Sequence, residues 1–230
     1  MNQVAIITAA SKGMGLACVE KLAEEGYQLA ILSRSSEIHD LASKFGGIAV
    51  QGSTDNADDL ARLVDATRET YGQIDVVINN TGHPPKGDLL DLTDEQWQEG
   101  INLALMNVVR MARLVTPHMN GGGSVINIST FGAKEPSLSF PISSVARTAL
   151  SAYTKLFATK YGEAGIRMNN ILPGFIDSYP ADQETINEIP LLRQGTPAEV
   201  AELAFFLAGD KSEYITGQDF LIDGGLVKSI

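Results

Sequence analysis

Short apolar segments alternate with stretches of helical periodicity along this chain, and that alternation constrains its fold more than any other feature. The segments VAIIT (4–8) and LAIL (29–32) are apolar almost throughout, rather than at every second position. Continuous apolarity indicates strands buried on both faces, as in a parallel sheet with helices on each side. The pattern therefore predicts an α/β fold with a doubly wound parallel sheet.

The same periodicity places the other elements. Further strands are expected at 48–52, 74–79, 124–129, 168–173 and 219–222. Helices are expected at 13–25, 38–45, 58–71, 94–119, 143–162 and 197–207, with an irregular segment between the sixth strand and the last helix. A length of 230 residues fits one core of this kind, so we expect a single Rossmann-type domain over 1–230.

Composition narrows the expected partners and location. The chain has 28 Asp and Glu against 17 Lys and Arg, a formal charge of −11 that repels nucleic acid and anionic membranes, so neither is expected as a partner. Cys18 is the only cysteine, which excludes an internal disulfide, and it is expected to be a buried helix residue rather than a metal ligand. The apolar run 4–7 is too short for a signal peptide or membrane span, and a cytoplasmic protein is expected.

The segment TAASKGMG (8–15) follows the first strand and opens the first helix. A dinucleotide pyrophosphate needs free backbone N–H groups, the positive end of a helix dipole and small side chains that let it approach. Gly13 and Gly15 permit that approach, although a purely structural glycine turn is the alternative. The residues expected to bind the phosphates are Thr8, Ser11, Lys12, Gly13, Met14 and Gly15.

Six motifs occur in the order and spacing of one known family. They are TAASKGMG (8–15), NNTG (79–82), Asn102, NIST (127–130), ILPGFIDS (171–178) and YITGQDFLIDGG (214–225). On these residues the chain resembles the short-chain dehydrogenases/reductases over essentially its whole length. The resemblance implies an NAD(P)-dependent oxidoreductase acting on a small carbonyl or alcohol. Ala9 stands where the family usually has glycine, and we expect a turn with negative φ there.

The segment after the second strand bears on the choice of cofactor. A carboxylate there would accept hydrogen bonds from the ribose 2′-hydroxyl of NAD and repel the 2′-phosphate of NADP. This chain has Ser33 and Arg34 instead, and Arg34 with Lys12 is expected to bind the 2′-phosphate. NADP is therefore the expected cofactor, with NAD as the alternative. The purely structural alternative is that Arg34 and Lys12 are two solvated surface cations with no role in binding. Ser53 stands where the family often holds adenine with an aspartate.

Small and amide side chains complete the cofactor site that the resemblance implies. Asn80 closes a buried strand and Gly82 leaves room for the adenosine ribose, with a plain turn as the alternative. Pro173 and Gly174 belong to ILPGFIDS and are expected to contact the cofactor. The family uses the asparagine at position 102 to hold a proton-relaying water, whereas a helix-bending polar residue is the other reading.

The catalytic positions implied by the resemblance are changed. The family has a serine that polarises the substrate, a tyrosine thirteen residues later that transfers the proton, and a lysine one helical turn further on that binds the nicotinamide ribose. Here Thr130, Ser143 and Arg147 occupy these positions. Thr130 retains a hydroxyl and Arg147 retains a charge and donors for the ribose. Ser143 is too short and too weakly acidic to replace a phenol, so the standard reaction is expected to be strongly impaired.

Two other residues are candidates to supply the missing proton-transfer group. His83 directly follows NNTG, close to where the nicotinamide would lie, and its ordinary pKa suits acid–base work. Tyr179 lies in the segment that closes over substrate in the family. Both have the alternative of being loop residues that line a repurposed pocket. Tyr153 lies nearly three turns beyond Ser143 on the same helix and is expected to be a packing residue.

Two functions of different classes fit this sequence. One is an NADP(H)-dependent oxidoreductase in which water or a substitute group provides the proton. The other is a catalytically inactive subunit that assembles with an active paralogue. The family usually forms dimers and tetramers through two long helices, here about 95–119 and 143–162, so a homo-oligomer or a hetero-oligomer is expected.

Overall fold

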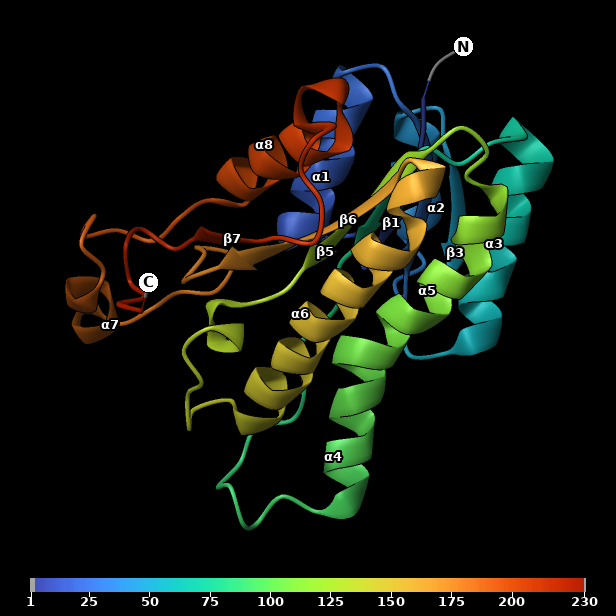
Figure 1. Cartoon of the computed structure of the whole chain (residues 1–230). Helices are drawn as coiled ribbons and strands as arrows, with labels where there is room; N and C mark the ends of the chain where they lie inside the picture. Colours follow the sequence, from blue (N-terminus) through green and yellow to red (C-terminus); the bar gives the residue numbers. More distant parts are fainter. Residues whose placement is uncertain (1–2, 230) are drawn as a thin grey trace.

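A computed structural model, which describes residues 3–229, contains one parallel sheet of seven strands (Figure 1). The strands are β1 (Val4–Thr8), β2 (Gln28–Ser33), β3 (Ile48–Gln51), β4 (Val76–Asn79), β5 (Gly123–Ile128), β6 (Ile166–Pro173) and β7 (Asp219–Ile222). Their order across the sheet is β3-β2-β1-β4-β5-β6-β7. The predicted doubly wound α/β fold is confirmed.

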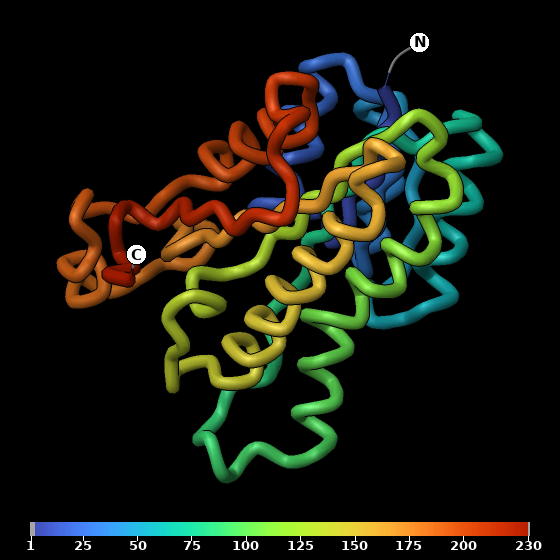
Figure 2. The backbone as a smooth tube through the Cα atoms, viewed as in Figure 1, coloured from blue at the N-terminus to red at the C-terminus, as the bar shows by residue number. Residues whose placement is uncertain are grey.

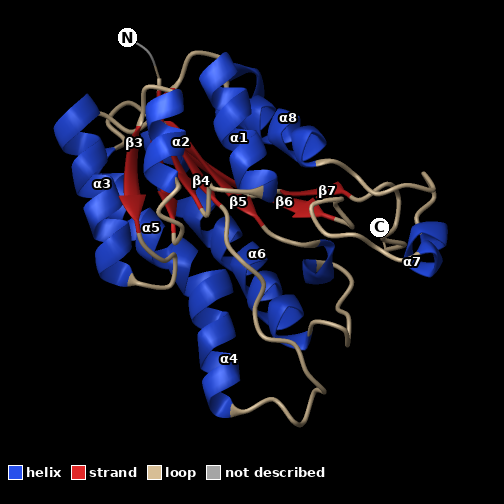
Figure 3. Ribbon diagram, turned by 180° about the vertical axis from the view of Figure 1, so that it is seen from behind, coloured by secondary structure: helices blue, strands red, loops and turns tan. Residues whose placement is uncertain are grey.

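Helices cover both faces of the sheet (Figure 3). One face carries α1 (Gly13–Glu24), α2 (Ile38–Lys44) and α8 (Pro197–Ala208), and the other carries α3 (Ala57–Tyr71), α5 (Asn107–Val115) and α6 (Pro141–Tyr161). Cys18 lies on α1 and is buried in the core of this face, as expected. The strands are mostly apolar because side chains on both of their faces enter a core.

The helix predicted over 94–119 is divided into four parts. It consists of α4 (Asp94–Ile101), a π-helical turn η1 (Asn102–Met106), α5 and a 3₁₀ turn η2 (Thr116–His118). Thr93 begins α4 with a capping box that includes Gln96, and Pro117 ends the α-helical pattern because it has no N–H to donate. The hydrophobic period that predicted the helix is too coarse to detect one extra residue in a turn.

Two further boundaries differ from the prediction. Helix α6 begins at Pro141 rather than at Ser143, because proline is well suited to the first helical turn. The segment expected to be irregular contains α7 (Gln183–Glu188), which begins where Asp182 accepts a hydrogen bond from the Thr185 N–H at 2.8 Å. No helix within residues 3–229 is long and apolar enough to cross a bilayer.

A row of three buried amides and one carboxylate crosses four neighbouring strands. Asn79, Asn127, Asn170 and Asp219 are register partners on β4, β5, β6 and β7. Asn79 Nδ2 donates to Asn127 Oδ1 at 2.9 Å, Asn127 Nδ2 donates to Asn170 Oδ1 at 2.9 Å, and Asn170 Nδ2 donates to Asp219 Oδ1 at 2.7 Å. Asp219 also pairs with Lys134 at 3.1 Å. The row fixes the register of four strands through side chains as well as backbone.

The loops that carry the candidate site residues leave the sheet at one edge. All strands are parallel, so the segments after β1, β2, β4, β5 and β6 begin at the same side of the sheet (Figure 2). Chain order reverses between β1, which precedes β2 and β3, and β4, which leads to β5 and β6. A sheet of this kind binds ligands in the crevice outside such a reversal.

Candidate functional site

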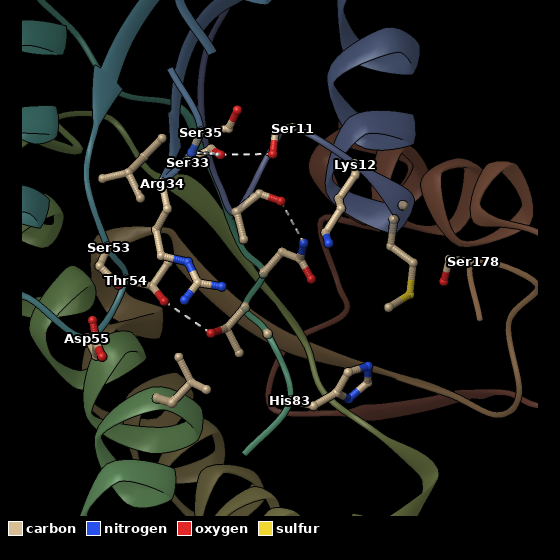
Figure 4. Close-up of a pocket in the computed structure, with 18 of the residues that line it drawn as sticks. Ser11, Lys12, Ser33, Arg34, Ser35, Ser53, Thr54, Asp55, His83 and Ser178 are labelled. Atoms are coloured by element: carbon tan, nitrogen blue, oxygen red, sulfur yellow. Dashed lines mark hydrogen bonds between the residues drawn. The ribbon is translucent and has the colours of Figure 1, made fainter. Parts of the chain in front are cut away.

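A cleft of about 910 Å³ lies at this edge of the sheet (Figure 4). Its walls come from the loops that follow β1, β2, β3 and β4 and from the segment after β6. Ser11, Ser33 and Ser35 lie at one end of the view, and His83 lies at the other. The cleft is thus elongated and is lined by residues from five separate loops.

The loop between β1 and α1 approaches the cleft with its backbone. Gly13 has a φ of +55°, and a Cβ on Gly15 would lie 2.3 Å from the carbonyl oxygen of Ala9. Ala9 has a φ of 46°, so the negative φ expected for it is wrong. The turn out of β1 requires the left-handed region, which costs an alanine roughly 1–2 kcal/mol. Asn80 Nδ2 holds this turn by donating to the Ala9 carbonyl oxygen at 3.2 Å.

Thr8 and Asn80 join the ends of β1 and β4 beneath the cleft. The Thr8 hydroxyl donates to the Asn80 carbonyl oxygen at 2.7 Å and accepts from the Asn80 N–H at 3.0 Å. Both residues are buried. Asn80 lines the cleft, as do Lys12, Met14 and Gly82, whereas Thr8 and Gly15 are not among its lining residues and instead shape its floor.

The end of β2 presents hydroxyls and a cation to the cleft. Ser33 Oγ donates to Ser11 Oγ at 2.8 Å and accepts from the Ser35 N–H at 3.1 Å. Arg34 and Lys12 line the same cleft, and so does Glu37, whose carboxylate accepts from the Ser35 hydroxyl at 3.4 Å. Position 33 therefore contributes a neutral donor–acceptor. The cleft as a whole is lined by two cations, Lys12 and Arg34, and by four carboxylates, those of Glu37, Asp55, Glu99 and Asp177.

The loop after β3 supplies residues that sequence reasoning missed. Ser53 lines the cleft as expected, but Thr54 and Asp55 line it as well. Thr54 Oγ1 lies 3.1 Å from Thr81 Oγ1, which ties this loop to the one after β4. The run GSTD (52–55) was the available signal, since it places a carboxylate two residues beyond Ser53. Asp55 provides the acidic acceptor that Ser53 lacks.

His83 and Tyr179 meet across the cleft. Their rings are edge to face, with centroids 5.1 Å apart, and both residues line the cleft. Desolvation lowers the pKa of His83 below its ordinary value of 6.5, and the positive charges of Lys86 and Arg147 lower it further. The imidazole is therefore mostly unprotonated at neutral pH.

The three changed catalytic positions lie in the loop after β5 and on α6. Thr130 begins the 3₁₀ turn η3 (Phe131–Ala133), where its hydroxyl accepts from the Gly132 N–H at 3.4 Å. Ser143 is half-buried in the first turn of α6. Arg147 is only 6% exposed, and its Nη1 donates to the Ile128 carbonyl oxygen at 2.5 Å. None of the three is among the residues that line the cleft.

Arg147 is a buried cation without a carboxylate partner among the described residues. Its Nε has no hydrogen-bond partner within residues 3–229, and burial lowers the pKa of the guanidinium to about 10. One donor atom of the guanidinium, Nη1, thus binds the backbone of β5, and the role of Arg147 at a cofactor ribose stays a prediction.

Comparisons with known proteins identify the family of this chain. The family profile described as enoyl-(acyl carrier protein) reductase matches residues 8–227. Dehydrogenase/reductase SDR family member 4 of Caenorhabditis elegans is 34% identical over 98% of this chain and 95% of its own length. The chain belongs to the short-chain dehydrogenase/reductase family. Oxidoreductase UcpA of Salmonella typhimurium is another relative, 32% identical over 97% of this chain and 94% of its own.

A solved structure shares the fold of this short-chain dehydrogenase/reductase. L-Sorbose reductase from Gluconobacter frateurii, complexed with NADPH and L-sorbose, matches with a TM-score of 0.92 at 29% identity. The match covers 100% of this chain and 98% of that chain.

Three other predicted residues of this short-chain dehydrogenase/reductase lie away from the cleft surface. Asn102 begins the π-helical turn, and its Oδ1 accepts from Arg110 Nη2 at 3.0 Å while Arg110 Nη1 donates to the Asp55 carbonyl oxygen at 2.8 Å. Its amide therefore ties α5 to the loop after β3. Pro173 is buried at the end of β6, and Gly174 is packed so closely that a Cβ would lie 2.8 Å from Asp223 Cα. Pro173 and Gly174 therefore contribute to the site by placing the backbone that follows β6.

Tyr153 behaves as the sequence predicts. It is half-buried beside Phe157, with ring centroids 6.4 Å apart, in the core cluster beneath α6. It is not among the residues that line the cleft.

Proposed function

We propose that this chain binds NADP(H) and that carbonyl–alcohol hydride transfer by the usual route of its family is strongly slowed. When bound, the nicotinamide cofactor supplies or takes up the hydride. Residues for the centre and for one end of such a cofactor are present: the Gly13–Gly15 turn for the pyrophosphate, and Asp55 with Thr54 for the adenine. The cradle fits, because Gly13 lines the cleft at the start of α1 with a φ of +55° and has no side chain that would keep a pyrophosphate from the backbone.

The observation that carries the choice of NADP(H) is the hydrogen-bonded hydroxyl of Ser33. It stands where a carboxylate would select NAD, and both of its bonds are to neutral groups. Arg34 and Lys12 line the cleft beside it and provide charge for a 2′-phosphate. L-Sorbose reductase, which shares the fold, is complexed with NADPH.

The slow reaction follows from positions 143 and 147. A serine hydroxyl does not ionise near neutral pH, and the Arg147 guanidinium is directed to the Ile128 carbonyl oxygen. Loss of a positioned general acid costs roughly 10²–10⁴ in rate. We therefore expect a small carbonyl or alcohol to bind with little turnover by the standard route.

Fluorescence titration tests the binding half of this proposal. NADPH should bind at least tenfold more tightly than NADH, and equal affinities for the two would contradict the choice of cofactor. A panel of small ketones tests the chemical half. Turnover as fast as that of the C. elegans relative measured side by side would contradict the impairment.

A catalytically inactive subunit that assembles with an active paralogue is the second candidate. Two large apolar side chains on α6 favour it, because Val145 is 54% exposed and Leu156 is 70% exposed on a helix whose other face enters the core. Purification from the native cell distinguishes the candidates: a paralogue that co-purifies in fixed ratio supports assembly, and a homo-oligomer alone contradicts it.

A further inference from the structure

We propose that His83, positioned by Tyr179, is the base that takes the proton from an alcohol substrate, so that the chemistry retained by this chain is alcohol oxidation. This inference rests on the proposed binding of NADP(H). The balance is complete: the alcohol O–H proton goes to the unprotonated ring nitrogen of His83, and the hydride on the same carbon goes to NADP⁺. A carbonyl, NADPH and an imidazolium result.

The backbone of His83 is fixed on both sides. Gly82 and His83 follow Asn80, whose backbone and side chain are bonded to Thr8 and Ala9. Pro84 is buried and packs toward Gly100 of α4, where a Cβ on the glycine would lie 3.2 Å from Pro84 Cβ. A residue before proline is also restricted to extended conformations. The imidazole is therefore placed by the scaffold and not by a free loop.

Tyr179 fixes the ring itself. Its edge-to-face contact at 5.1 Å comes from the segment after β6, on the opposite wall of the cleft. Tyr179 is itself exposed, and its backbone is held by hydrogen bonds to Ile176 and Gln194. His83 is also exposed, which gives an imidazolium a direct route for releasing its proton to water.

The charges around His83 favour its role as a base over a role as an acid. Lys86 lies on its own loop and Arg147 on α6, and both lower its pKa in addition to desolvation. Lys12, Glu99 and Asp177 line the same cleft. Reduction would require an imidazolium at the start, and that form is scarce at neutral pH. Oxidation starts from the neutral ring, which is the abundant form.

Proton NMR of the histidines tests the environment of the His83 imidazole and does not depend on enzymatic activity. The His83 resonance, assigned by its loss in His83→Asn, should titrate below pH 6.5. Tyr179→Ala should move that midpoint upward, because the ring is then more hydrated, whereas His39→Asn should leave it unchanged. A midpoint at or above 6.5 in the wild type would overturn the proposal.

Kinetics of NADP⁺-dependent oxidation across secondary alcohols test the chemistry. We expect kcat/KM to fall as the pH drops through the His83 midpoint, and His83→Asn to remove this acid limb and lower kcat roughly 10²–10⁴-fold. Tyr179→Ala should lower kcat with little change in KM, while Tyr179→Phe should keep most of kcat. His39→Asn, which alters an exposed histidine on α2, is the matched control.

NADP⁺ binding, measured for each variant, separates the two proposals. Binding by the wild type without any oxidation, or oxidation that persists with the same acid limb in His83→Asn, overturns the role of His83 and leaves cofactor binding intact. Failure of NADP⁺ and NADPH to bind overturns the proposed function, and this inference with it.

Discussion

Arg147 donates from its buried guanidinium to the backbone carbonyl oxygen of Ile128, and so a cation on α6 is bound to the end of β5. Position 147, where the family has a lysine that binds the nicotinamide ribose, thus holds an arginine that is hydrogen-bonded to the sheet. Beside it, Ser129 Oγ and Arg147 Nε are the buried side-chain atoms without partners in residues 3–229. An unpaired buried charge is costly, and this geometry leads directly to a stability prediction.

Arg147→Met should keep the unfolding free energy unchanged or raise it by about 1–4 kcal/mol at pH 7, because it removes a buried charge and keeps an apolar stem. Burial lowers the folded-state pKa to about 10, so the wild type gains stability as pH rises above that value and the difference from Arg147→Met should narrow. Urea unfolding of the wild type and of Arg147→Met at pH 7 and pH 10.5 measures the stability difference and its change with pH. A loss of more than 2 kcal/mol in Arg147→Met at pH 7 would show that the Ile128 contact outweighs the cost of burial.

Ser33→Asp should invert the choice of cofactor. A carboxylate at this position would repel a 2′-phosphate and accept from a ribose hydroxyl, so NADPH affinity should fall by about tenfold or more while NADH affinity rises. Fluorescence titration with both cofactors measures the change. Ser43→Asp, on the exposed end of α2, is a charge-matched control that should leave both affinities unaltered.

Gly15→Ala should damage the phosphate loop. Its Cβ would lie 2.3 Å from the Ala9 carbonyl oxygen and 2.7 Å from Asn80 Nδ2, so the turn must shift. We expect NADPH binding to weaken by at least tenfold, together with a lower melting temperature. Gly162→Ala is the control, because a Cβ there meets nothing within 4 Å and should leave the melting temperature unchanged or raised. Equal behaviour of the two variants would contradict the close approach.

Ser143→Tyr combined with Arg147→Lys should restore reduction of small ketones. If the missing phenol limits the rate, NADPH oxidation should increase by roughly 10²–10⁴. The pair Ser143→Phe with Arg147→Lys supplies the ring without its hydroxyl and should stay near the wild-type rate. Similar rates for the two double variants would show that proton transfer is not what the wild type lacks.

Asn127→Val should destabilise the fold through the amide row. It leaves the Asn79 donor without its partner in the sheet, at about 1–3 kcal/mol, whereas the Asn170 acceptor keeps the Thr154 hydroxyl at 2.9 Å. Thermal and urea unfolding should both report the loss, with no change in the denaturant slope. A change below 1 kcal/mol would mean that other groups satisfy these amides.

The fold was predictable because its signal is local. Most strands between Val4 and Pro173 are indicated by runs of mainly apolar residues, and the longer helices by their period, so the sheet and its covering layers follow from short windows. The π-helical turn at Asn102 and helix α7 were missed, since one inserted residue or one six-residue helix barely alters a hydrophobic period. The left-handed φ of Ala9 was missed because its cause, the approach of Asn80, is distant in sequence.

By itself, the sequence determined the parallel sheet, the glycine turn at its first strand end, the family and the residue types at positions 130, 143 and 147. Only the tertiary structure decided that Arg147 faces Ile128, that Asp55 enters the cleft, and that His83 meets Tyr179. Strand burial and turn chemistry depend on neighbours in the chain. The direction of a side chain in a crevice depends on contacts between loops that lie far apart in sequence and converge only when the sheet forms.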